Sequence, residues 1–388
     1  MSFRVFSPLI FSLGDIKFYM SNMAEISQLA EMSTQLPVNW YLDPKILEVE
    51  KRILFDHGPG YVGHEVMVPN VGDYYVPEWM NNAKVLMRNE QGIELLSNVC
   101  RHRQALLLSG RNNTKSIVCP IHRWTYALNG KLLGAPHFDQ NPCLNLSKTA
   151  LQNWNGLLFS GERDVANDMA NLNVLHDFNF SGYQFERVQI DHYHCNWKTF
   201  IEVYLEDYHV DPFHPGLSHF VDTKKLDWQL GDWYSVQTVA IDSARLQKPG
   251  TSVYAKWHEQ VLQQTNGEMP PHGAIWLLYY PNVMLEWYPH TLIISTILPT
   301  GVESCTNVVE FYYPEEIALF ERDFVEAEQA AYKETALEDD EICRLMTAGR
   351  RALYEQGLNE TGPYQMPMEE GMKHFHQFLQ REIGPYTR

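Results

Sequence analysis

The sequence contains no apolar run long enough to cross a membrane as a helix. Such a helix needs roughly 18–20 consecutive apolar residues, and no stretch of the 388 residues reaches that length. The opening segment, MSFRVFSPLIFSLGDI, has a short apolar run, but Pro8 interrupts it, Asp15 follows closely and no small-residue cleavage site is present. We therefore expect a cytoplasmic protein, with Met20 and Met23 open as alternative first residues.

Cysteines and basic residues are also few. Six cysteines spread over the chain do not form the dense disulfide framework of a small secreted domain, so free or metal-bound thiols are expected. The 30 Lys and Arg are outnumbered by 48 Asp and Glu, and the net charge of −18 argues against DNA or another polyanion as the main partner.

A binding signature for nicotinamide or flavin is missing as well. GPGYVG, residues 58–63, matches the pattern G-x-G-x-x-G, but the dinucleotide fingerprint needs a strand before it and a helix after it. Here a helical pattern precedes the glycines and a β-like pattern follows them. We interpret this segment as a glycine-rich connector.

The chain does contain a clear change of pattern near residue 61. Residues 24–35 and 43–55 have the pattern of short amphipathic helices, the second with Asp43 as N-cap and Pro44 at its first position. From about 61 to 160, short apolar runs alternate with turn dipeptides, which predicts an all-β unit of short antiparallel strands.

After about residue 165 the pattern is mixed. Residues 196–209 are predicted to be helical, residues 274–312 to form three long strands, and residues 314–356 to form long helices. A sheet followed by long helices predicts an α+β unit. We divide the chain into an N-terminal helical arm, an all-β unit and an α+β unit, over residues 1–40, 41–165 and 166–388.

Two short motifs in the β unit pair cysteine with histidine. Cys100 and His102 form the first pair and Cys119 and His122 the second, with sixteen residues between the pairs. Two cysteines and two histidines are a common zinc set, so zinc stays open. A C2H2 finger keeps its cysteines together, whereas here each loop supplies one Cys and one His. This order favours a [2Fe–2S] cluster in which one iron takes both cysteines and the other both histidines.

A second group of metal-binding side chains lies in NWKTFIEVYLEDYHVDPFHPGL, residues 196–217. On an undisturbed helix His209 and His214 would lie about 140° apart, which is poor for a shared metal, but Pro212 breaks the helix between them. The two histidines can then converge, and a carboxylate from elsewhere completes a 2-His-1-carboxylate site for Fe(II). Zinc is possible here too, but a one-electron donor in the same chain favours iron.

Together these motifs resemble the α subunit of the Rieske non-haem iron oxygenases, the ring-hydroxylating and demethylating family. CRH at 100–102 and CPIHRWTY at 119–126 are similar to the two halves of the Rieske motif, and EDYH and HPGL are similar to the iron-binding segment. The resemblance implies a Rieske [2Fe–2S] domain and then a helix-grip (START-like) catalytic domain with an antiparallel sheet and long C-terminal helices. It also implies a head-to-tail homotrimer, with or without a separate β subunit.

The resemblance further assigns roles to acidic residues. The family's bridge to a Rieske histidine of the neighbouring subunit matches Glu206, with Asp207 as the alternative, and Glu here resembles the members that oxidise quaternary amines. The family's third iron ligand matches Asp339, with Asp340 as the alternative. The expected catalytic group is therefore Glu206, His209, His214 and Asp339.

The implied activity requires a separate electron donor, an NAD(P)H-dependent reductase or a ferredoxin. The cofactors are the Rieske [2Fe–2S] cluster and one mononuclear non-haem Fe(II), which uses O2 to hydroxylate, dihydroxylate or oxidatively demethylate a small substrate. We expect an aromatic substrate. The alternatives are a betaine-, choline- or carnitine-like quaternary amine, or a non-catalytic Rieske electron-transfer protein with a ligand-binding domain. The pocket is expected along one alternation of the late strands, or among its neighbours: Trp276, Leu278, Tyr280, Met284, Glu286 and Tyr288.

Overall fold

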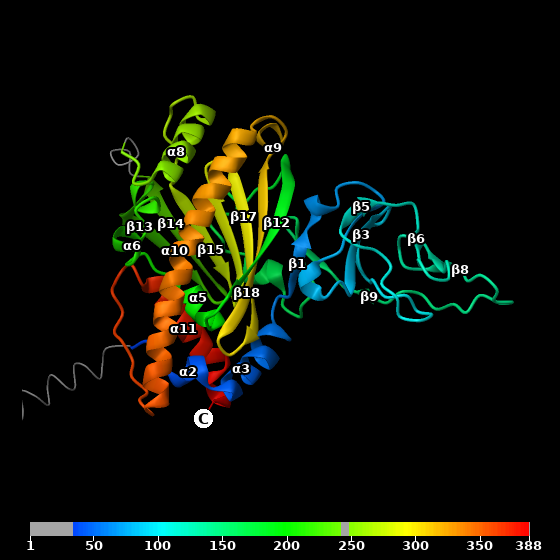
Figure 1. Cartoon of the computed structure of the whole chain (residues 1–388), viewed down its shortest axis with the longest axis horizontal. Helices are drawn as coiled ribbons and strands as arrows, with labels where there is room; N and C mark the ends of the chain where they lie inside the picture. Colours follow the sequence, from blue (N-terminus) through cyan, green and yellow to red (C-terminus); the bar gives the residue numbers. More distant parts are fainter. Residues whose placement is uncertain (1–33, 242–247, 388) are drawn as a thin grey trace, which may run out of the picture.

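The computed structural model describes residues 34–241 and 248–387. The helix expected over residues 24–35 and most of the arm expected over 1–40 lie outside these residues. Figure 1 shows a small β unit that projects from a larger unit, in which long helices cover an antiparallel sheet. No helix within the described ranges is both long and apolar enough to span a membrane.

The small unit confirms the all-β prediction for residues 61–160. Its strands form three small sheets, with the orders β1-β11-β10, β5-β2-β3-β4-β9 and β6-β7-β8, in which every pair is antiparallel. The strands are β1 (Tyr61–His64), β2 (Asp73–Tyr75), β3 (Lys84–Asn89), β4 (Gly92–Ser97), β5 (Arg111–Asn113), β6 (Ile117–Val118), β7 (Thr125–Tyr126), β8 (Leu132–Gly134), β9 (Lys148–Thr149), β10 (Gln152–Trp154) and β11 (Leu157–Phe159).

The larger unit contains a seven-stranded antiparallel sheet with the order β12-β18-β17-β16-β15-β14-β13. Its strands are β12 (Tyr183–Tyr193), β13 (Val221–Gly231), β14 (Tyr234–Ile241), β15 (Ala274–Tyr279), β16 (Val283–Tyr288), β17 (Thr291–Gly301) and β18 (Ser304–Pro314). The prediction of three strands over residues 274–312 was wrong, because there are four. Pro289 and His290 form a tight turn between β16 and β17, in which His290 adopts a φ of 60° and Tyr288 pairs with Thr291.

Helices cover this sheet and carry the residues of interest. The helix α5 (Trp197–Tyr204) ends five residues before the predicted limit, and α10 (Arg322–Glu355) runs across the sheet (Figure 1) after the short helix α9 (Glu315–Phe320). The prediction of helices over residues 314–356 is confirmed, with a break at Glu321. The remaining α-helices within the described residues are α2 (Asn39–Leu42), α3 (Pro44–Glu50), α4 (Val165–Asp168), α6 (Val210–Phe213), α8 (Ser252–Gln264) and α11 (Glu370–Glu382).

The helices before residue 56 pack on the larger unit, whereas His57 and Pro59 contact Glu162 and Gly161 next to β11. Asp43 caps α3 as predicted, and its side chain accepts a hydrogen bond from the Lys45 N–H. Further along α3, the buried Glu50 accepts hydrogen bonds from Trp197 Nε1 at 2.7 Å and from Lys198 Nζ at 2.5 Å. We therefore propose that the β unit begins near residue 60 and not at residue 41.

The two units meet through an apolar core that includes β1, β11 and the face of the long sheet. Glu310 is buried at this junction, where the hydroxyls of Tyr61 and Tyr312 each donate to it at 2.7 Å. This core fixes the β unit against that face of the sheet. The loops that carry the Cys and His pairs lie toward the opposite, projecting end of the β unit (Figure 1).

Candidate metal centres and substrate pocket

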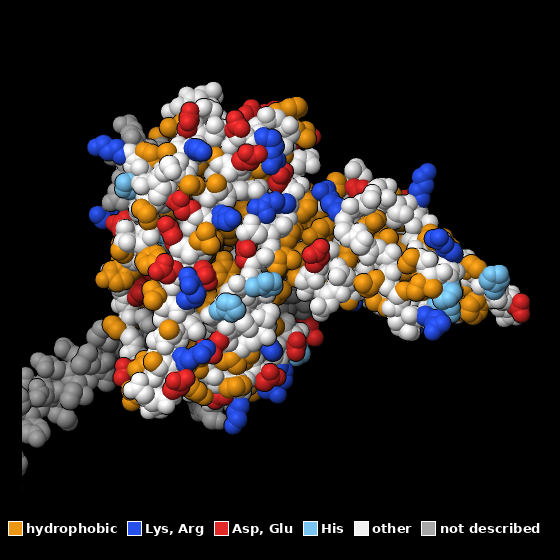
Figure 2. Space-filling view, viewed as in Figure 1, with side chains coloured by type: hydrophobic (Ala, Val, Ile, Leu, Met, Phe, Trp, Pro, Cys, Tyr) orange, Lys and Arg blue, Asp and Glu red, His pale blue; other side chains and the backbone are white. Residues whose placement is uncertain are grey.

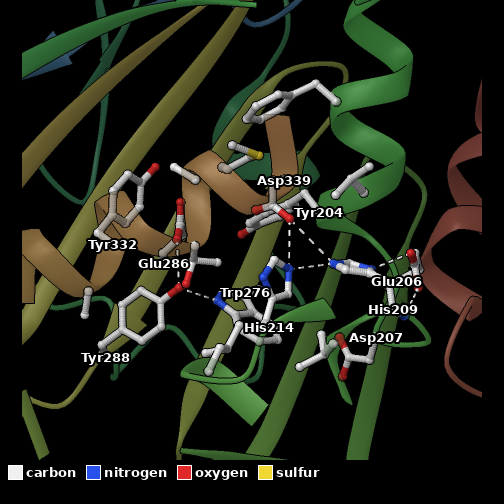
Figure 3. Close-up of a pocket in the computed structure, with 18 of the residues that line it drawn as sticks. Tyr204, Glu206, Asp207, His209, His214, Trp276, Glu286, Tyr288, Tyr332 and Asp339 are labelled. Carbon is white, nitrogen blue, oxygen red and sulfur yellow. Dashed lines mark hydrogen bonds and ion pairs between the residues drawn. The ribbon is translucent and has the colours of Figure 1, made fainter. Parts of the chain in front are cut away.

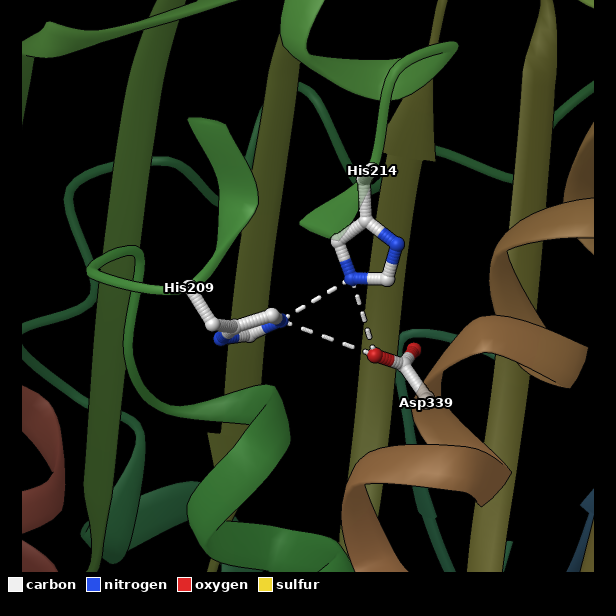
Figure 4. A group of neighbouring side chains, drawn as sticks. All are labelled: His209, His214 and Asp339. Atoms are coloured by element: carbon white, nitrogen blue, oxygen red, sulfur yellow. Dashed lines mark hydrogen bonds and ion pairs between the residues drawn. The ribbon is translucent and has the colours of Figure 1, made fainter. Parts of the chain in front are cut away.

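The structure brings together three of the four predicted catalytic residues as a compact triad (Figure 4). The Nε2 atoms of His209 and His214 lie 2.9 Å apart, and Asp339 Oδ1 lies 3.0 Å from His214 Nε2 and 3.5 Å from His209 Nε2. Imidazole binds a first-row metal at about 2.0–2.1 Å, so ligand atoms at right angles around one ion lie about 3 Å apart. The three side chains therefore fit one face of a six-coordinate iron.

The local fold explains why two histidines five residues apart converge. The helix α5 has already ended at Tyr204, and His209 and His214 flank the short helix α6. Asp339 reaches them from the middle of α10. Asp340, the alternative ligand, turns away and pairs with Arg344 at 3.2 Å.

The triad has the electrostatics of a cation site. Burial lowers the pKa of His209, but hydrogen bonds to Asp339 and Glu206 outweigh burial and raise the pKa to about 10. Burial raises the pKa of Asp339, but its contacts with His209 and His214 hold it below the ordinary value. Asp339 Oδ1 is buried and faces both Nε2 atoms, at 3.0 and 3.5 Å. A divalent ion would satisfy this oxygen and both imidazoles.

Two glutamates hold the outer nitrogens of the histidines. Glu206 Oε1 lies 2.5 Å from His209 Nδ1, and its other oxygen accepts from the His209 backbone N–H. Glu338 Oε2 lies 2.7 Å from His214 Nδ1. A carboxylate at Nδ1 directs the lone pair of Nε2 toward the metal. Asp207, the alternative to Glu206, instead accepts from Gln237 Nε2 at 2.7 Å.

Glu338 should therefore support iron binding without touching the metal. Because such a partner orients a ligand histidine, we expect Glu338→Gln to weaken Fe(II) affinity by about tenfold. Competition with a chelator measures this affinity. Glu334→Gln is the control, since Glu334 lies one turn earlier on α10 and accepts from Thr251. Equal iron affinity in the wild type and in both variants would refute this role.

A cavity of about 100 Å³ lies beside the triad (Figure 3). This volume suits only a compact ligand, since it is smaller than the cavity of about 150 Å³ that can hold benzene. Of the six pocket residues predicted from the strands, Trp276, Met284, Glu286 and Tyr288 line it. Leu278 and Tyr280 do not, because they belong to the core beneath α11.

The other wall of the cavity was missed by the sequence reasoning. It is the face of α10 that continues from Asp339 toward the helix start, at helical spacing: Glu328, Ala331, Tyr332, Thr335 and Ala336. Counting back from Asp339 in steps of three and four residues would have found it. Burial raises the pKa of Glu328 to about 8 and of Glu286 to about 7.

In the β unit, two loops of matching backbone geometry hold the Cys and His pairs. Each cysteine N–H donates to the carbonyl five residues later and each cysteine carbonyl accepts from the N–H four residues later. In both loops that fourth residue, Gln104 or Arg123, has a positive φ. The rings of His102 and His122 lie 4.6 Å apart, between their centroids.

This arrangement fits the predicted cluster. Both cysteines are buried, and the buried Nδ1 of His102 has no hydrogen-bond partner among the described residues. Burial raises the pKa of the Cys100 thiol, but donors that include the Tyr126 hydroxyl outweigh burial and lower it, which favours a thiolate. Two buried thiols behind two more accessible imidazoles are the donor set of a Rieske cluster.

A Rieske-type β unit joined to a helix-covered sheet with a 2-His-1-carboxylate triad defines the class of Rieske non-haem iron oxygenases. The family models agree: residues 60–153 match the Rieske [2Fe-2S] domain, and residues 181–384 match the ring hydroxylating alpha subunit (catalytic domain). The chain belongs to this family, and its cofactors are a Rieske cluster and a mononuclear iron.

Three individual relatives are named for the substrates on which they act. Putrescine 2-hydroxylase of Ralstonia nicotianae is 60% identical over 93% of this chain and 99% of its own length, and that of Bordetella bronchiseptica is 49% identical over 94% and 88%. Choline monooxygenase of Beta vulgaris is 26% identical over 89% and 76%.

Solved structures show the same fold. A quaternary ammonium Rieske monooxygenase in complex with L-carnitine has a TM-score of 0.68 at 19% identity, covering 91% of this chain and 96% of its own. Naphthalene 1,2-dioxygenase from Rhodococcus has a TM-score of 0.69 at 17% identity, covering 97% and 100%.

Proposed function

We propose that this oxygenase hydroxylates putrescine, or a close α,ω-diamine, at a carbon next to an aminomethyl group. The main support is the 60% identity, over nearly the full length of both chains, to a relative named putrescine 2-hydroxylase. The cavity agrees with a cationic substrate. Five acidic residues line it, and no described lysine or arginine does: Glu206, Asp207, Glu286, Glu328 and Asp339.

The reaction inserts one oxygen atom into a C–H bond. Substrate, O2, two electrons and two protons give the alcohol and one water, and the electrons come from NAD(P)H through a separate reductase or ferredoxin. When bound, the mononuclear iron supplies the activation of O2. His209, His214 and Asp339 hold the iron, while Glu206 and Glu338 orient the two imidazoles. The aromatic and apolar lining excludes water and positions the substrate.

We also propose that the electrons enter from a neighbouring subunit of a homotrimer. The Cys and His loops lie at the projecting end of the β unit, and α6 with the triad lies on the far side of the larger unit (Figure 1). Figure 2 shows histidine and apolar side chains together at this projecting end, where Ile121, Leu133 and Phe138 are exposed. Such a surface is suited to docking on another copy near Glu206.

Substrates other than a diamine fit the cavity less well. Trp276, Tyr288 and Tyr332 could surround a quaternary ammonium ion, and the choline monooxygenases are relatives, so this is the second candidate. A trimethylammonium group has no N–H to donate to Glu286 or Glu328. A neutral aromatic ring, our first expectation from the sequence, would leave both carboxylates without a counter-ion.

A cytoplasmic location is consistent with this proposal. All six cysteines are free in the structure, as expected in a reducing compartment, and an NAD(P)H-dependent donor is found there.

Turnover with a substrate panel tests the proposed function. The purified protein, loaded with iron and coupled to a surrogate reductase and ferredoxin, is given putrescine, choline, L-carnitine or benzoate. We expect NADH consumption coupled to a product 16 Da heavier with putrescine, and little product with the others. Coupled product from choline or carnitine and none from putrescine would favour the second candidate and overturn the first.

A further inference from the structure

Glu286 is a buried carboxylate that faces the cavity without a cationic partner. It lies on β16, and Figure 3 shows it with Tyr288 and Tyr332 on one side of the pocket, with the triad on the other. Tyr288 Oη donates to Glu286 Oε2 at 3.1 Å and Ser295 Oγ donates to Oε1 at 3.3 Å. Both hydrogen bonds are long for hydroxyl donors.

These contacts leave much of the carboxylate unsatisfied. An ionised carboxylate accepts about four hydrogen bonds, and a buried charge without a partner is costly. No described lysine or arginine pairs with Glu286. A buried acid of this kind destabilises the ligand-free fold. It therefore indicates a binding site for a cation that carries several N–H donors. A primary ammonium group has three.

Comparison with the other buried glutamates supports this reading. Glu310 receives two tyrosine hydroxyls at 2.7 Å and does not line the cavity, so its role is structural. Glu328 lines the cavity, and its Oε2 accepts from the Tyr313 hydroxyl. Burial, and to a smaller extent repulsion from Glu286, raises the pKa of Glu328, and both acids line the same cavity.

Resting on the proposed function, we propose that Glu286 binds the ammonium group remote from the hydroxylated carbon and thereby determines which carbon is hydroxylated. In putrescine, C2 is the third carbon counted from the remote nitrogen and the second from the near one. The aromatic rings of Trp276 and Tyr288 lie beside Glu286 and can stack on the cation. Glu328 assists as the second acid.

If Glu286 anchors the remote ammonium group, the position at which a longer diamine is hydroxylated can be predicted. If the remote ammonium is the reference point, 1,5-diaminopentane is hydroxylated at the third carbon from the anchored nitrogen, which is its central carbon C3. If the near ammonium is the reference point, the same substrate is hydroxylated at C2. NMR of the product from the wild-type protein separates the two cases without any variant.

The pH dependence of binding is a second readout. The groups that face Glu286 are Tyr288 and Ser295 from the sheet, Tyr204 from α5, and Glu328, Tyr332 and Asp339 from α10. Burial raises the pKa of all three tyrosines, so they stay neutral. Since burial raises the pKa of Glu286 to about 7 and that of Glu328 to about 8, putrescine affinity should fall as the pH is lowered through 8 and then 7, by up to about tenfold per unit for each acid.

The deciding variants are Glu286→Gln and, as a matched control, Glu310→Gln, which replaces another buried glutamate with a pKa of about 7. Calorimetric titration with putrescine should show about 30- to 100-fold weaker binding for Glu286→Gln, with a shallower pH profile, and unchanged binding for Glu310→Gln. Hydroxylation of 1,5-diaminopentane by Glu286→Gln should no longer be confined to C3.

The outcomes separate this inference from the proposed function. If the wild type hydroxylates putrescine but attacks 1,5-diaminopentane at C2, or if Glu286→Gln binds putrescine within threefold of the wild type, the anchor is wrong and the function stands. If the wild type does not hydroxylate putrescine at all, both the Glu286 anchor and the proposed function are wrong. Hydroxylation at C3, together with a pH-dependent affinity that Glu286→Gln removes, supports the anchor.

Discussion

Asp339→Ala is expected to abolish hydroxylation while the visible Rieske spectrum stays unchanged. Asp339 supplies the only carboxylate of the triad, at 3.0 and 3.5 Å from the two Nε2 atoms. Its loss leaves two neutral imidazoles, which hold Fe(II) weakly. We expect the iron content to fall to that of the cluster alone and activity to fall by about 1,000-fold or more. Elemental analysis and product formation measure the two effects.

Asp340→Ala is the matched control for Asp339→Ala. Asp340 is the next residue on α10, but its side chain pairs with Arg344 at 3.2 Å and faces away from the triad. This variant should keep its iron and its activity. Full iron content and activity in Asp339→Ala, or loss of both only in Asp340→Ala, would transfer the ligand role to another residue.

Glu206→Gln is expected to lower turnover by about 100-fold while the chain retains its cluster and most of its mononuclear iron. The Glu206 carboxylate holds His209 Nδ1 at 2.5 Å and also accepts from the His209 backbone N–H. A neutral amide orients the imidazole less strongly and cannot form a charged bridge to a second histidine. Stopped-flow reoxidation of the reduced cluster, followed by its colour with substrate and O2 present, should be slowed to the same extent.

Asp207→Asn distinguishes the two candidates for this bridge. Asp207 accepts from Gln237 in the ligand-free chain, and burial raises its pKa to about 7. We therefore expect cluster reoxidation in Asp207→Asn to stay within severalfold of the wild type. Slow reoxidation in Asp207→Asn with a normal rate in Glu206→Gln would make Asp207 the bridge.

The prediction of both metal centres was based mainly on short local motifs. Cys100, His102, Cys119 and His122 lie within two short loops, so their order in the sequence already reflects their order in space. His209 and His214 flank one short helix, but the break expected at Pro212 was wrong, because α5 already ends at Tyr204 and Pro212 lies within α6. Asp339 is distant in sequence, and only the family resemblance pointed to it.

The substrate side of the site depends on contacts that no local pattern contains. Glu286 has an alternation typical of any strand, and Glu328 belongs to a helix rich in glutamate. The sequence analysis did place Glu286 among the expected pocket residues, but nothing in the sequence marks either glutamate as a buried acid. Only the packing of α10 on the sheet buries both and raises the pKa values of both, and this packing makes a cationic substrate preferable to an aromatic one.

The same limit applies to the start of the β unit, which we propose lies near residue 60. Residues 43–55 were correctly predicted as helical, but their partners Trp197 and Lys198 lie about 150 positions away, as the separations of 147 and 148 residues show. The turn at His290 was missed, although proline is common in turns and histidine is one of the residues enriched at positive φ.

The most direct test is a single turnover of the fully reduced protein with putrescine and ¹⁸O2, followed by mass spectrometry of the product. Reduction of both metal centres beforehand removes any dependence on the choice of reductase. We predict hydroxyputrescine with one ¹⁸O atom per molecule, in an amount close to that of the occupied mononuclear sites. Unlabelled product, or no product from a chain with both centres loaded and reduced, would contradict the central claim that this iron site hydroxylates a diamine with O2.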